Sequence, residues 1–333
     1  MNDCRTEIRF DPRKDAFDLR TEEGWPEARH KFDEESIWAI RAALATGRPL
    51  LVRGEPGTGK SQLARAAATE LKRPLLYEVI NSHTEVTDLL YQFDAVARLA
   101  EAQIQGAVRA SEEKVKAVLA PEKFVRPGKV WWSVNWAGAA AQAALSKSAT
   151  PSEPNGASFR NGCVLLVDEI DKADSELPNA LLECFANQSF QVPYLENSVS
   201  SPSLAEQPAP LVVVTTNEER ELPAPFLRRC FVLHLDLAAD DEQLRAFLIE
   251  RGGVQFEKKY SEVSGYEDVL KEAADQLIKD RRAAGPNVVH KPGQAEYLDL
   301  CRAVFEIASQ GSCGSALEVL HRVERFALTK NQR

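Results

Sequence analysis

The chain has 333 residues, which is enough to bury a sizeable core and to form two domains or one elaborated domain. Hydrophobic residues make up 44% and charged residues 27%, an ordinary composition for a soluble protein. The formal net charge of −9 argues against a protein that coats nucleic acid non-specifically, although a local basic channel is compatible with it.

Neither a membrane anchor nor a secretion signal is expected from the sequence. The apolar runs are only a few residues long, far shorter than a segment that crosses a bilayer. The first residues, MNDCRTEIRF, lack the apolar core of a signal peptide. The 6 cysteines are scattered without a C-x-x-C pair, which favours reduced, structural thiols in the cytosol and argues against zinc. We therefore expect a cytoplasmic protein.

The predicted elements begin with a polar, irregular N-terminal arm over residues 1–30. A helix is predicted over roughly 33–45, because apolar residues recur there on one face and Gly47 follows. Five short apolar runs come next, separated by helical stretches, and each run is continuously apolar rather than alternating. They lie at 49–53, 74–80, 163–170, 211–216 and 231–235.

Continuous apolar runs are typical of strands in a parallel sheet that is covered on both faces. We therefore predict an α/β domain over residues 31–237, with a doubly wound parallel sheet flanked by helices. Helical insertions are expected near 94–119 and 131–161. The pattern over 238–333 is helical and predicts a separate C-terminal lid domain. For the tryptophans Trp131, Trp132 and Trp136 we favour packing in a core over gripping a partner.

The first chemical motif is GEPGTGKS, which satisfies the pattern G-x-x-x-x-G-K-[ST] between a predicted strand and a predicted helix. Its glycines let backbone N–H groups surround phosphates, and the helix N-terminus adds a positive dipole. Lys60 is expected to reach the β- and γ-phosphates, and Ser61 to bind Mg²⁺. The alternative is a glycine turn that only joins two elements. The predicted phosphate-binding residues are Gly54, Glu55, Pro56, Gly57, Thr58, Gly59, Lys60, Ser61 and Gln62.

The second motif is VLLVDEID, whose apolar residues place Asp168 and Glu169 at the carboxyl end of a buried strand, where α/β sheets bind ligands. Asp168 is expected to hold Mg²⁺, directly or through a water, and Glu169 to polarise the attacking water as a general base. The alternative is an acidic helix cap after a strand. For Asp171, helix capping and a catalytic or intersubunit role both stay open.

Two further signals follow the acidic motif. Asn217 ends the run LVVVTTN, where it orients the attacking water beside Glu169 or serves only as a turn residue. Arg228 and Arg229 stand side by side just before the last apolar run, so two permanent cations need a negative partner. That partner is either a phosphate or a surface ion pair with a nearby glutamate. The nearby glutamates are Glu218, Glu219 and Glu221.

The order of these motifs, with DEIDKAD, TTN and ELPAPFLRRC, resembles the AAA+ ATPases of the MoxR-like family. The similarity covers roughly residues 31–330, and the specific motifs lie within 49–235. It implies a P-loop AAA+ core with ATP and Mg²⁺ as cofactors, followed by the helical lid. It also implies a β-hairpin near 187–200, whose Phe190 and Tyr194 either line a ring pore or fasten the hairpin to its own domain.

The resemblance also implies an assembly and a purpose. In such rings, here a homo-oligomeric hexamer, Arg228 and Arg229 would act on the γ-phosphate held by the neighbouring subunit. The implied catalytic residues are therefore Glu169, Asn217, Arg228 and Arg229. Hydrolysis would remodel or activate a partner protein in a chaperone-like manner. The family implies that this partner carries a von Willebrand factor A domain.

One position departs from the family. MoxR-like lids usually carry a second nucleotide-sensing arginine, and its expected position here is Ser315. Arg322 or Arg325 could replace it from further along the same helix. Two other functions stay open: a nucleic-acid-acting NTPase motor, which needs a basic pore, and a slow ATP-switched scaffold, which the departure at Ser315 favours.

Overall fold

The computed structural model describes residues 10–12, 16–19, 25–108, 111–204, 206–283, 291–310 and 314–327. Contacts within the chain divide it into two compact units. The first comprises Met1–Pro12, Glu34–Val52 and Ala64–Leu233, and the second comprises Arg13–Asp33, Arg53–Leu63 and His234–Arg333. Within the described residues, no helix combines the length and the apolar character needed to cross a bilayer.

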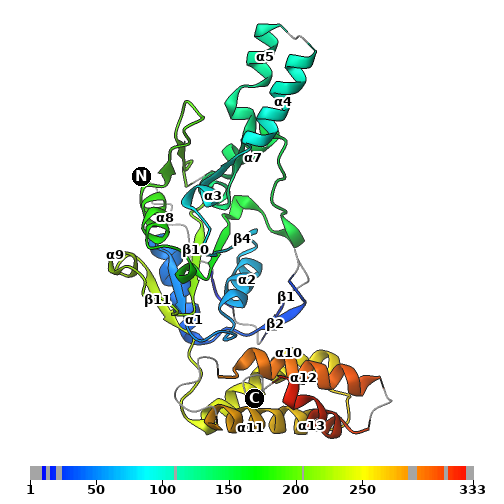
Figure 1. Ribbon diagram of the computed structural model, residues 1–333. Helices are drawn as coiled ribbons and strands as arrows, with labels where there is room; N and C mark the ends of the chain where they lie inside the picture. Colours follow the sequence, from blue (N-terminus) through cyan, green and yellow to red (C-terminus); the bar gives the residue numbers. More distant parts are fainter. Residues whose placement is uncertain are drawn as a thin grey trace. The chain divides into compact units, whose positions relative to one another are not determined.

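A parallel five-stranded sheet organises the α/β part of the chain, with the strand order β11-β3-β10-β7-β4 (Figure 1). Its strands are β3 (Leu50–Arg53), β4 (Leu75–Val79), β7 (Val164–Asp168), β10 (Leu211–Thr216) and β11 (Phe231–His234). Each strand coincides with one of the predicted apolar runs. The predicted parallel sheet, flanked by helices and followed by a helical region, is confirmed.

The two strands β7 and β10 are buried along their whole length, which explains why Val164–Val167 and Leu211–Val214 are continuously apolar. They run parallel, with Leu211 beside Val164. Strand β4 pairs with the opposite edge of β7, where Val79 lies beside Asp168. The carboxyl ends of parallel strands lie at the same edge of a sheet. Asp168 therefore lies at the edge where β10 ends.

Helices cover this sheet and contribute apolar faces to its core. The helix α1 buries Ile40 and Ala43, and α8 buries Leu177 and Leu181. The flanking helices are α1 (Glu34–Thr46), α2 (Lys60–Leu71), α8 (Glu176–Asn187) and α9 (Ala224–Leu227). Short 3₁₀ turns are η1 (Pro121–Phe124), η2 (Pro154–Gly156), η3 (Phe159–Asn161) and η4 (Ile170–Lys172).

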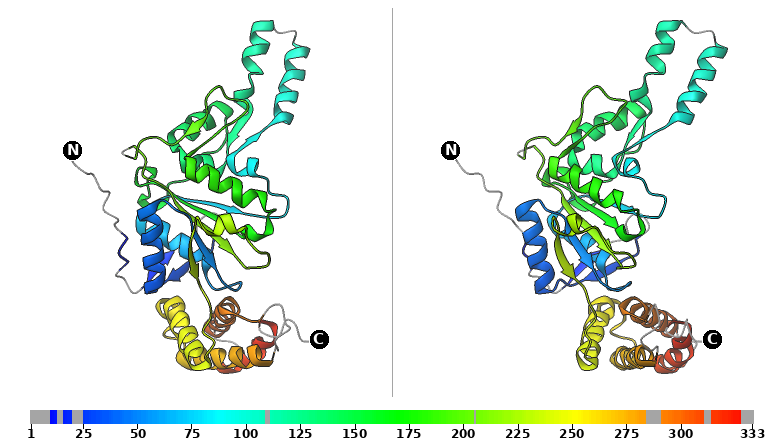
Figure 2. Two further views of the ribbon diagram at one scale, coloured as in Figure 1. Left: turned by 90° about the vertical axis from the view of Figure 1, so that its left-hand side faces the viewer. Right: turned by 60° about the vertical axis from the view of Figure 1, so that its left-hand side comes forward.

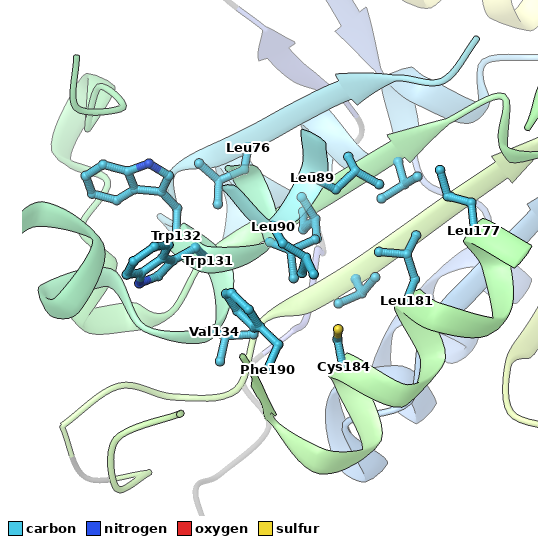
Figure 3. Packing of buried hydrophobic residues seen from close by; sticks show 14 of the residues in the cluster. Leu76, Leu89, Leu90, Trp131, Trp132, Val134, Leu177, Leu181, Cys184 and Phe190 are labelled. Carbon is cyan, nitrogen blue, oxygen red and sulfur yellow. The ribbon is translucent and has the colours of Figure 1, made fainter. Parts of the chain in front are cut away.

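The tryptophan cluster packs in the core of the first unit, on helices α6 (Lys129–Val134) and α7 (Trp136–Ser146) (Figure 3). Trp131 and Trp132 are each 3% exposed. The Trp131 ring meets the edge of Phe190 with 6.0 Å between ring centroids. The expected packing role of these tryptophans is confirmed, and their burial leaves no ring surface with which to grip a partner.

The first insertion forms a small antiparallel ladder from which two helices extend as a pair (Figure 1). The ladder joins β5 (Tyr91–Phe93) to β6 (Val125–Pro127). The helices preceding and following β5 are α3 (Val86–Leu90), α4 (Ala95–Ala107) and α5 (Glu112–Val118). Asp94 caps α4, because its carboxylate accepts the N–H of Ala97 at 2.8 Å.

The segment near 187–200 contains the antiparallel pair β8 (Ser189–Phe190) and β9 (Val199–Ser200). Phe190 is 8% exposed and belongs to the core of the first unit. Tyr194 stacks on Phe93 with 4.0 Å between ring centroids. Both aromatic rings therefore fasten this hairpin to its own unit, which favours the second of the two roles expected for them.

The second unit contains the C-terminal helices (yellow to red in Figure 2), a short N-terminal ladder and the segment Arg53–Leu63. The helices are α10 (Asp241–Tyr260), α11 (Tyr266–Ala283), α12 (Gln294–Ser309) and α13 (Ala316–Ala327). Their common core is apolar and aromatic, with Tyr297 and Phe305 completely buried. The buried hydroxyl of Tyr297 has a hydrogen-bond partner there, because it donates to the backbone oxygen of Leu270.

The N-terminal region differs from the irregular arm expected for residues 1–30. It contains the antiparallel pair β1 (Phe17–Leu19) and β2 (Ala28–His30), and Leu19 is buried. The side chain of Arg29 donates to the backbone oxygen of Val254 in α10, at 2.9 Å. Strands of three residues are too short to show an alternating pattern in the sequence, which is why they were missed. Residues 1–9, 13–15 and 20–24 of the expected arm lie outside the described residues.

Two adjacent glycines in α10 give a matched test of packing in this bundle. A Cβ on Gly252 would lie 2.6 Å from the hydroxyl of Tyr297 and 2.7 Å from Cδ2 of Leu270, whereas a Cβ on Gly253 would meet nothing within 4 Å. Overpacking of a core costs about 1–3 kcal/mol, so Gly252→Ala is expected to lower the free energy of unfolding by that amount. Gly253→Ala should raise it by about 0.5–1 kcal/mol, because alanine favours the helix. Urea denaturation monitored by circular dichroism measures both, and equal effects would contradict the packing.

Candidate nucleotide-binding and hydrolysis site

The predicted phosphate loop follows β3 directly and leads into α2. Gly57 has a φ of +78°, and a Cβ there would lie 2.7 Å from the Cβ of Ala295. Gly54 lies against the backbone oxygen of Leu235, which a Cβ would approach to 2.5 Å. Two of the loop glycines are therefore required both for backbone conformation and for close packing within the second unit, against Leu235 and Ala295.

Lys60 is the first residue of α2 and is 6% exposed. Its Nζ donates to the backbone oxygens of Gly54 and Glu55, each at 2.8 Å. The hydroxyl of Thr58 also donates to the backbone oxygen of Glu55, at 3.0 Å. These bonds curl the loop around the ammonium group, so that a buried cation lies where the loop meets the helix N-terminus.

The residues of this loop fit the phosphates of a nucleotide. Positive φ values at Gly57 and Gly59 turn successive backbone N–H groups toward the concave side of the loop. The N-terminus of the 12-residue α2 and the ammonium of Lys60 add positive charge there. Such a donor set suits an anion with several oxygens, which is the chemistry that the motif predicts.

Asp168, the last residue of β7, is held by hydrogen bonds from its two neighbouring strands. The hydroxyl of Thr215 in β10 donates to its Oδ1 at 2.5 Å, and Tyr77 in β4 donates to its Oδ2 at 3.3 Å. Burial and the Asp168 carboxylate raise the pKa of Tyr77 to about 12, so the phenol keeps its proton and acts as a donor. Asp168 is thus a fixed carboxylate, as a metal ligand needs to be.

Glu169 has an unusual backbone conformation, with φ of +61° in the left-handed region, where non-glycine residues are uncommon. Its N–H donates to the hydroxyl of Thr215 at 2.9 Å, which stabilises this conformation. The amide of Asn217 donates to its Oε1 at 3.1 Å, and Lys172 donates to its Oε2 at 2.6 Å. Both carboxylate oxygens are therefore oriented by named partners.

Asp171, for which the sequence left two roles open, is a structural anchor. Its side chain is 2% exposed and accepts the backbone N–H groups of Asn217, at 3.4 Å, and Glu219, at 2.9 Å. The carboxylate thereby fixes the segment that follows β10, on which Asn217 depends for its position. Within the subunit its observed contacts are those of an anchor and not of a helix cap, and a catalytic or intersubunit role stays a prediction.

Arg228 and Arg229 follow the short helix α9 and are both exposed. Across the part of the chain that the structure describes, neither guanidinium has a hydrogen bond or an ion pair, including with Glu218, Glu219 or Glu221. The alternative of a surface ion pair thus has no support within this subunit. Two unpaired cations at the surface are available to a negative group on another molecule.

The phosphate loop in the second unit and the strand end in the first unit each carry groups that hydrolysis of a nucleotide needs. The loop can bind phosphates, and Ser61 and Asp168 can each offer one oxygen to a divalent cation. Among the described residues, no group of three or more His, Cys, Asp or Glu side chains forms a metal site of its own. Mg²⁺ in phosphate-binding sites is typically held by one or two side chains together with the phosphates, which fits this donor set.

Sequence reasoning missed three residues of the site: Tyr77, Lys172 and Thr215. Lys172 could have been found, because it lies three residues after Glu169, a spacing at which side chains meet on a helical turn. Tyr77 and Thr215 carry no such signal. They act only because β4 and β10 flank β7, and strand order is not readable from a single sequence.

Ser315, which stands where a second nucleotide-sensing arginine is expected, caps a helix. The hydroxyl of Ser315 accepts the N–H of Glu318, and the Glu318 carboxylate accepts the N–H of Ser315 in return. Arg322, one of the two suggested substitutes, is exposed on α13. Ser315 thus stabilises the start of a helix, and the side chain of Arg325, the other suggested substitute, lies outside the described residues.

Comparison with known proteins agrees with this geometry. A family model for the AAA domain of the dynein-related subfamily matches residues 49–230, more than half of the chain. No match was found among curated proteins.

Solved structures are similar at low sequence identity. The Holliday junction branch migration motor RuvB of Thermotoga maritima is 15% identical, over 88% of this chain and 67% of that chain, with a TM-score of 0.40. A point variant of RuvB is 16% identical with the same coverages and a TM-score of 0.42. A proposed ATPase of Cytophaga hutchinsonii is 14% identical, over 88% of this chain and 79% of that chain, with a TM-score of 0.36.

Proposed function

This chain belongs to the AAA domain family, in the dynein-related subfamily, and from that premise we propose that it is a Mg²⁺-dependent ATP hydrolase. The observation that carries the proposal is the set of bonds around Glu169. A carboxylate at the end of a buried strand is oriented by Asn217 and Lys172, beside a second carboxylate, Asp168, that is fixed by two hydroxyls.

The residues have separate tasks in the proposed mechanism. Lys60 and the backbone N–H groups of its loop bind the phosphates, while Ser61 and Asp168 hold Mg²⁺. When bound, Mg²⁺ neutralises part of the phosphate charge. Glu169 accepts the proton of the attacking water on a carboxylate oxygen, each of which has more than one acceptor position. Asn217 keeps that carboxylate turned toward the water.

We further propose that the chain works as a ring, a hexamer, in which the unpaired Arg228 and Arg229 serve the nucleotide of a neighbouring subunit. The resemblance to MoxR-like proteins supports a chaperone-like role, in which hydrolysis remodels or activates a partner that carries a von Willebrand factor A domain. The lack of a second nucleotide-sensing arginine at Ser315 predicts slow turnover without that partner.

Phosphate release from ATP tests the enzymatic part of the proposal. We expect hydrolysis that requires Mg²⁺, stops on chelation and rises per subunit as the protein concentration is increased, because rings must assemble. Light scattering with and without ATP measures the assembly. Absence of hydrolysis in assembled rings, alone and with candidate partners, would contradict an ATP hydrolase and would favour a nucleotide-switched scaffold.

Affinity capture tests the partner. Glu169→Gln protein loaded with ATP should retain partner proteins that ADP-loaded protein releases, and mass spectrometry of that difference should identify a chain with a von Willebrand factor A domain. A retained fraction made of nucleic acid, or of proteins without such a domain, would overturn the proposed partner.

A further inference from the structure

An ion pair joins the phosphate loop to the helical bundle of the second unit. Arg281, in the last turn of α11, places Nη1 3.0 Å from Oε2 of Glu55 and Nη2 3.2 Å from Oε1 and 3.0 Å from Oε2. This is a two-pronged arginine–carboxylate contact, the strongest geometry for such a pair. Its partners are 226 residues apart in sequence, so only the fold brings them together.

The arginine is held in place from a third direction. Its Nη1 also donates to the backbone oxygen of Pro292 at 2.7 Å, and its side chain is only 16% exposed. Because the backbone oxygen of Pro292 holds the guanidinium independently of Glu55, the arginine loses little freedom when it binds the loop. Arg281 is therefore a preorganised part of the bundle, and Glu55, which is 47% exposed, is the movable partner.

Glu55 lies at a sensitive place in the loop. Its backbone oxygen accepts the ammonium of Lys60, and its carboxylate adds a negative charge next to a cradle built for anions. Like charges at such short range disfavour phosphate binding, and more so for each added phosphate. In the present arrangement, the charge of Arg281 offsets that of Glu55.

We propose that Arg281 is a positioning residue for nucleotide binding: through Glu55 it fixes the phosphate loop against α11 and α12, and it cancels a negative charge beside the phosphates. The proposal rests on the proposed nucleotide binding and deepens it. A shift of α11 away from the loop breaks the pair and exposes the charge of Glu55, so the helical bundle controls phosphate affinity without contacting the phosphates.

Binding of ATP, ADP and AMP to purified variants tests this role by calorimetry. Arg281→Ala is expected to weaken ATP binding by about fivefold, near 1 kcal/mol, with a smaller loss for ADP and less than about twofold for AMP. Glu55→Gln in the Arg281→Ala background should return ATP binding to within about twofold of the parent, because the uncompensated charge is gone. Arg281→Lys keeps the positive charge but loses the two-pronged guanidinium geometry. Its ATP affinity should therefore lie between those of the parent and of Arg281→Ala.

The chain offers a matched control at the next residue. Arg282 ends the same helix but pairs with Asp241, so Arg282→Ala should leave all three affinities unchanged. Without nucleotide, Arg281→Ala should lower the unfolding temperature at low salt more than at high salt, as loss of a partly exposed ion pair predicts.

Three results would overturn the inference: unchanged ATP affinity in Arg281→Ala, equal losses for ATP and AMP, or no recovery with Glu55→Gln. If Arg281→Ala does not fold, Glu55→Gln alone decides. It keeps one acceptor for Arg281 and removes the negative charge, so ATP should bind at least as tightly as to the parent, and clearly weaker binding would count against the proposal. If the parent protein itself binds no ATP, the proposed function fails instead.

Discussion

Replacing Arg228 and Arg229 together with alanine is expected to reduce turnover by about a thousandfold or more while leaving nucleotide binding nearly intact. An arginine that neutralises charge on the transferred phosphoryl group contributes roughly 4 kcal/mol to the transition state. Both side chains are exposed and have no partner among the described residues of their own subunit. Their loss should therefore not destabilise the fold. A surface ion pair would contribute at most about 1 kcal/mol to stability and nothing to the rate.

Subunit mixing locates the site of action of these arginines. Subunits with Arg228→Ala and Arg229→Ala are mixed with Lys60→Ala subunits, each inactive alone, and mixed rings should recover part of the activity. Recovery is expected because one type of subunit contributes an intact phosphate loop and the other an intact arginine pair. Arg220→Ala, which removes another exposed arginine of the same segment, should keep the parent rate. Full activity in dilute monomer, or no recovery despite co-assembly, would show that the arginines do not act on the nucleotide of a neighbouring subunit.

The second large effect concerns Glu169. Changing it to glutamine should leave ATP bound and reduce hydrolysis by roughly a hundredfold to ten-thousandfold, the usual contribution of a general base. The amide retains an oxygen that can accept from Lys172 or Asn217, so the geometry of the strand end should survive. ATP should then hold the ring together for longer than in the parent protein, because the phosphate that joins the subunits persists. Single-turnover phosphate release and light scattering measure the two effects, and hydrolysis at the parent rate would show that Glu169 is not the base.

Lys60→Ala is the companion variant and should abolish nucleotide binding. The lysine also bonds the backbone oxygens of Gly54 and Glu55, so its removal loosens the loop as well as removing a cation. Titration with a fluorescent nucleotide analogue checks the loss, and an unchanged circular dichroism spectrum confirms that the fold persists. Binding of ATP with parent affinity would refute the assignment of the loop.

Much of the sheet and of the motifs could be predicted because local sequence determines them. Strands β7 and β10 begin with four apolar residues each because both their faces are buried, and the loop at Gly54–Ser61 has a backbone that only its glycines allow. Asp168, Glu169 and Asn217 each lie at or just after the end of a strand, so their place at the carboxyl edge of a parallel sheet could be predicted, whereas the adjacency of the two strands comes from the structure.

The remainder could not be predicted because it depends on contacts between distant segments. The pair between Arg281 and Glu55 joins residues that no local pattern connects. Tyr77 donates to Asp168 only because strand β4 lies beside β7. The role of Asp171 was open for the same reason, since the N–H groups that donate to it belong to the chain after β10.

The buried carboxylate of Asp171 has a mechanical consequence for the ring. It clamps the chain at residues 217 and 219, and the exposed Arg228 and Arg229 come only nine residues further on. In the proposed ring, a neighbouring subunit that pulled on the arginines would strain the segment 220–223 first, and the hydrogen bonds to Asp171 would keep that strain from Asn217 and Glu169. Glu169 could then stay oriented toward the water while the boundary between subunits moves. The orientation of the catalytic residues and the flexibility between subunits would thus depend on different stretches of the chain.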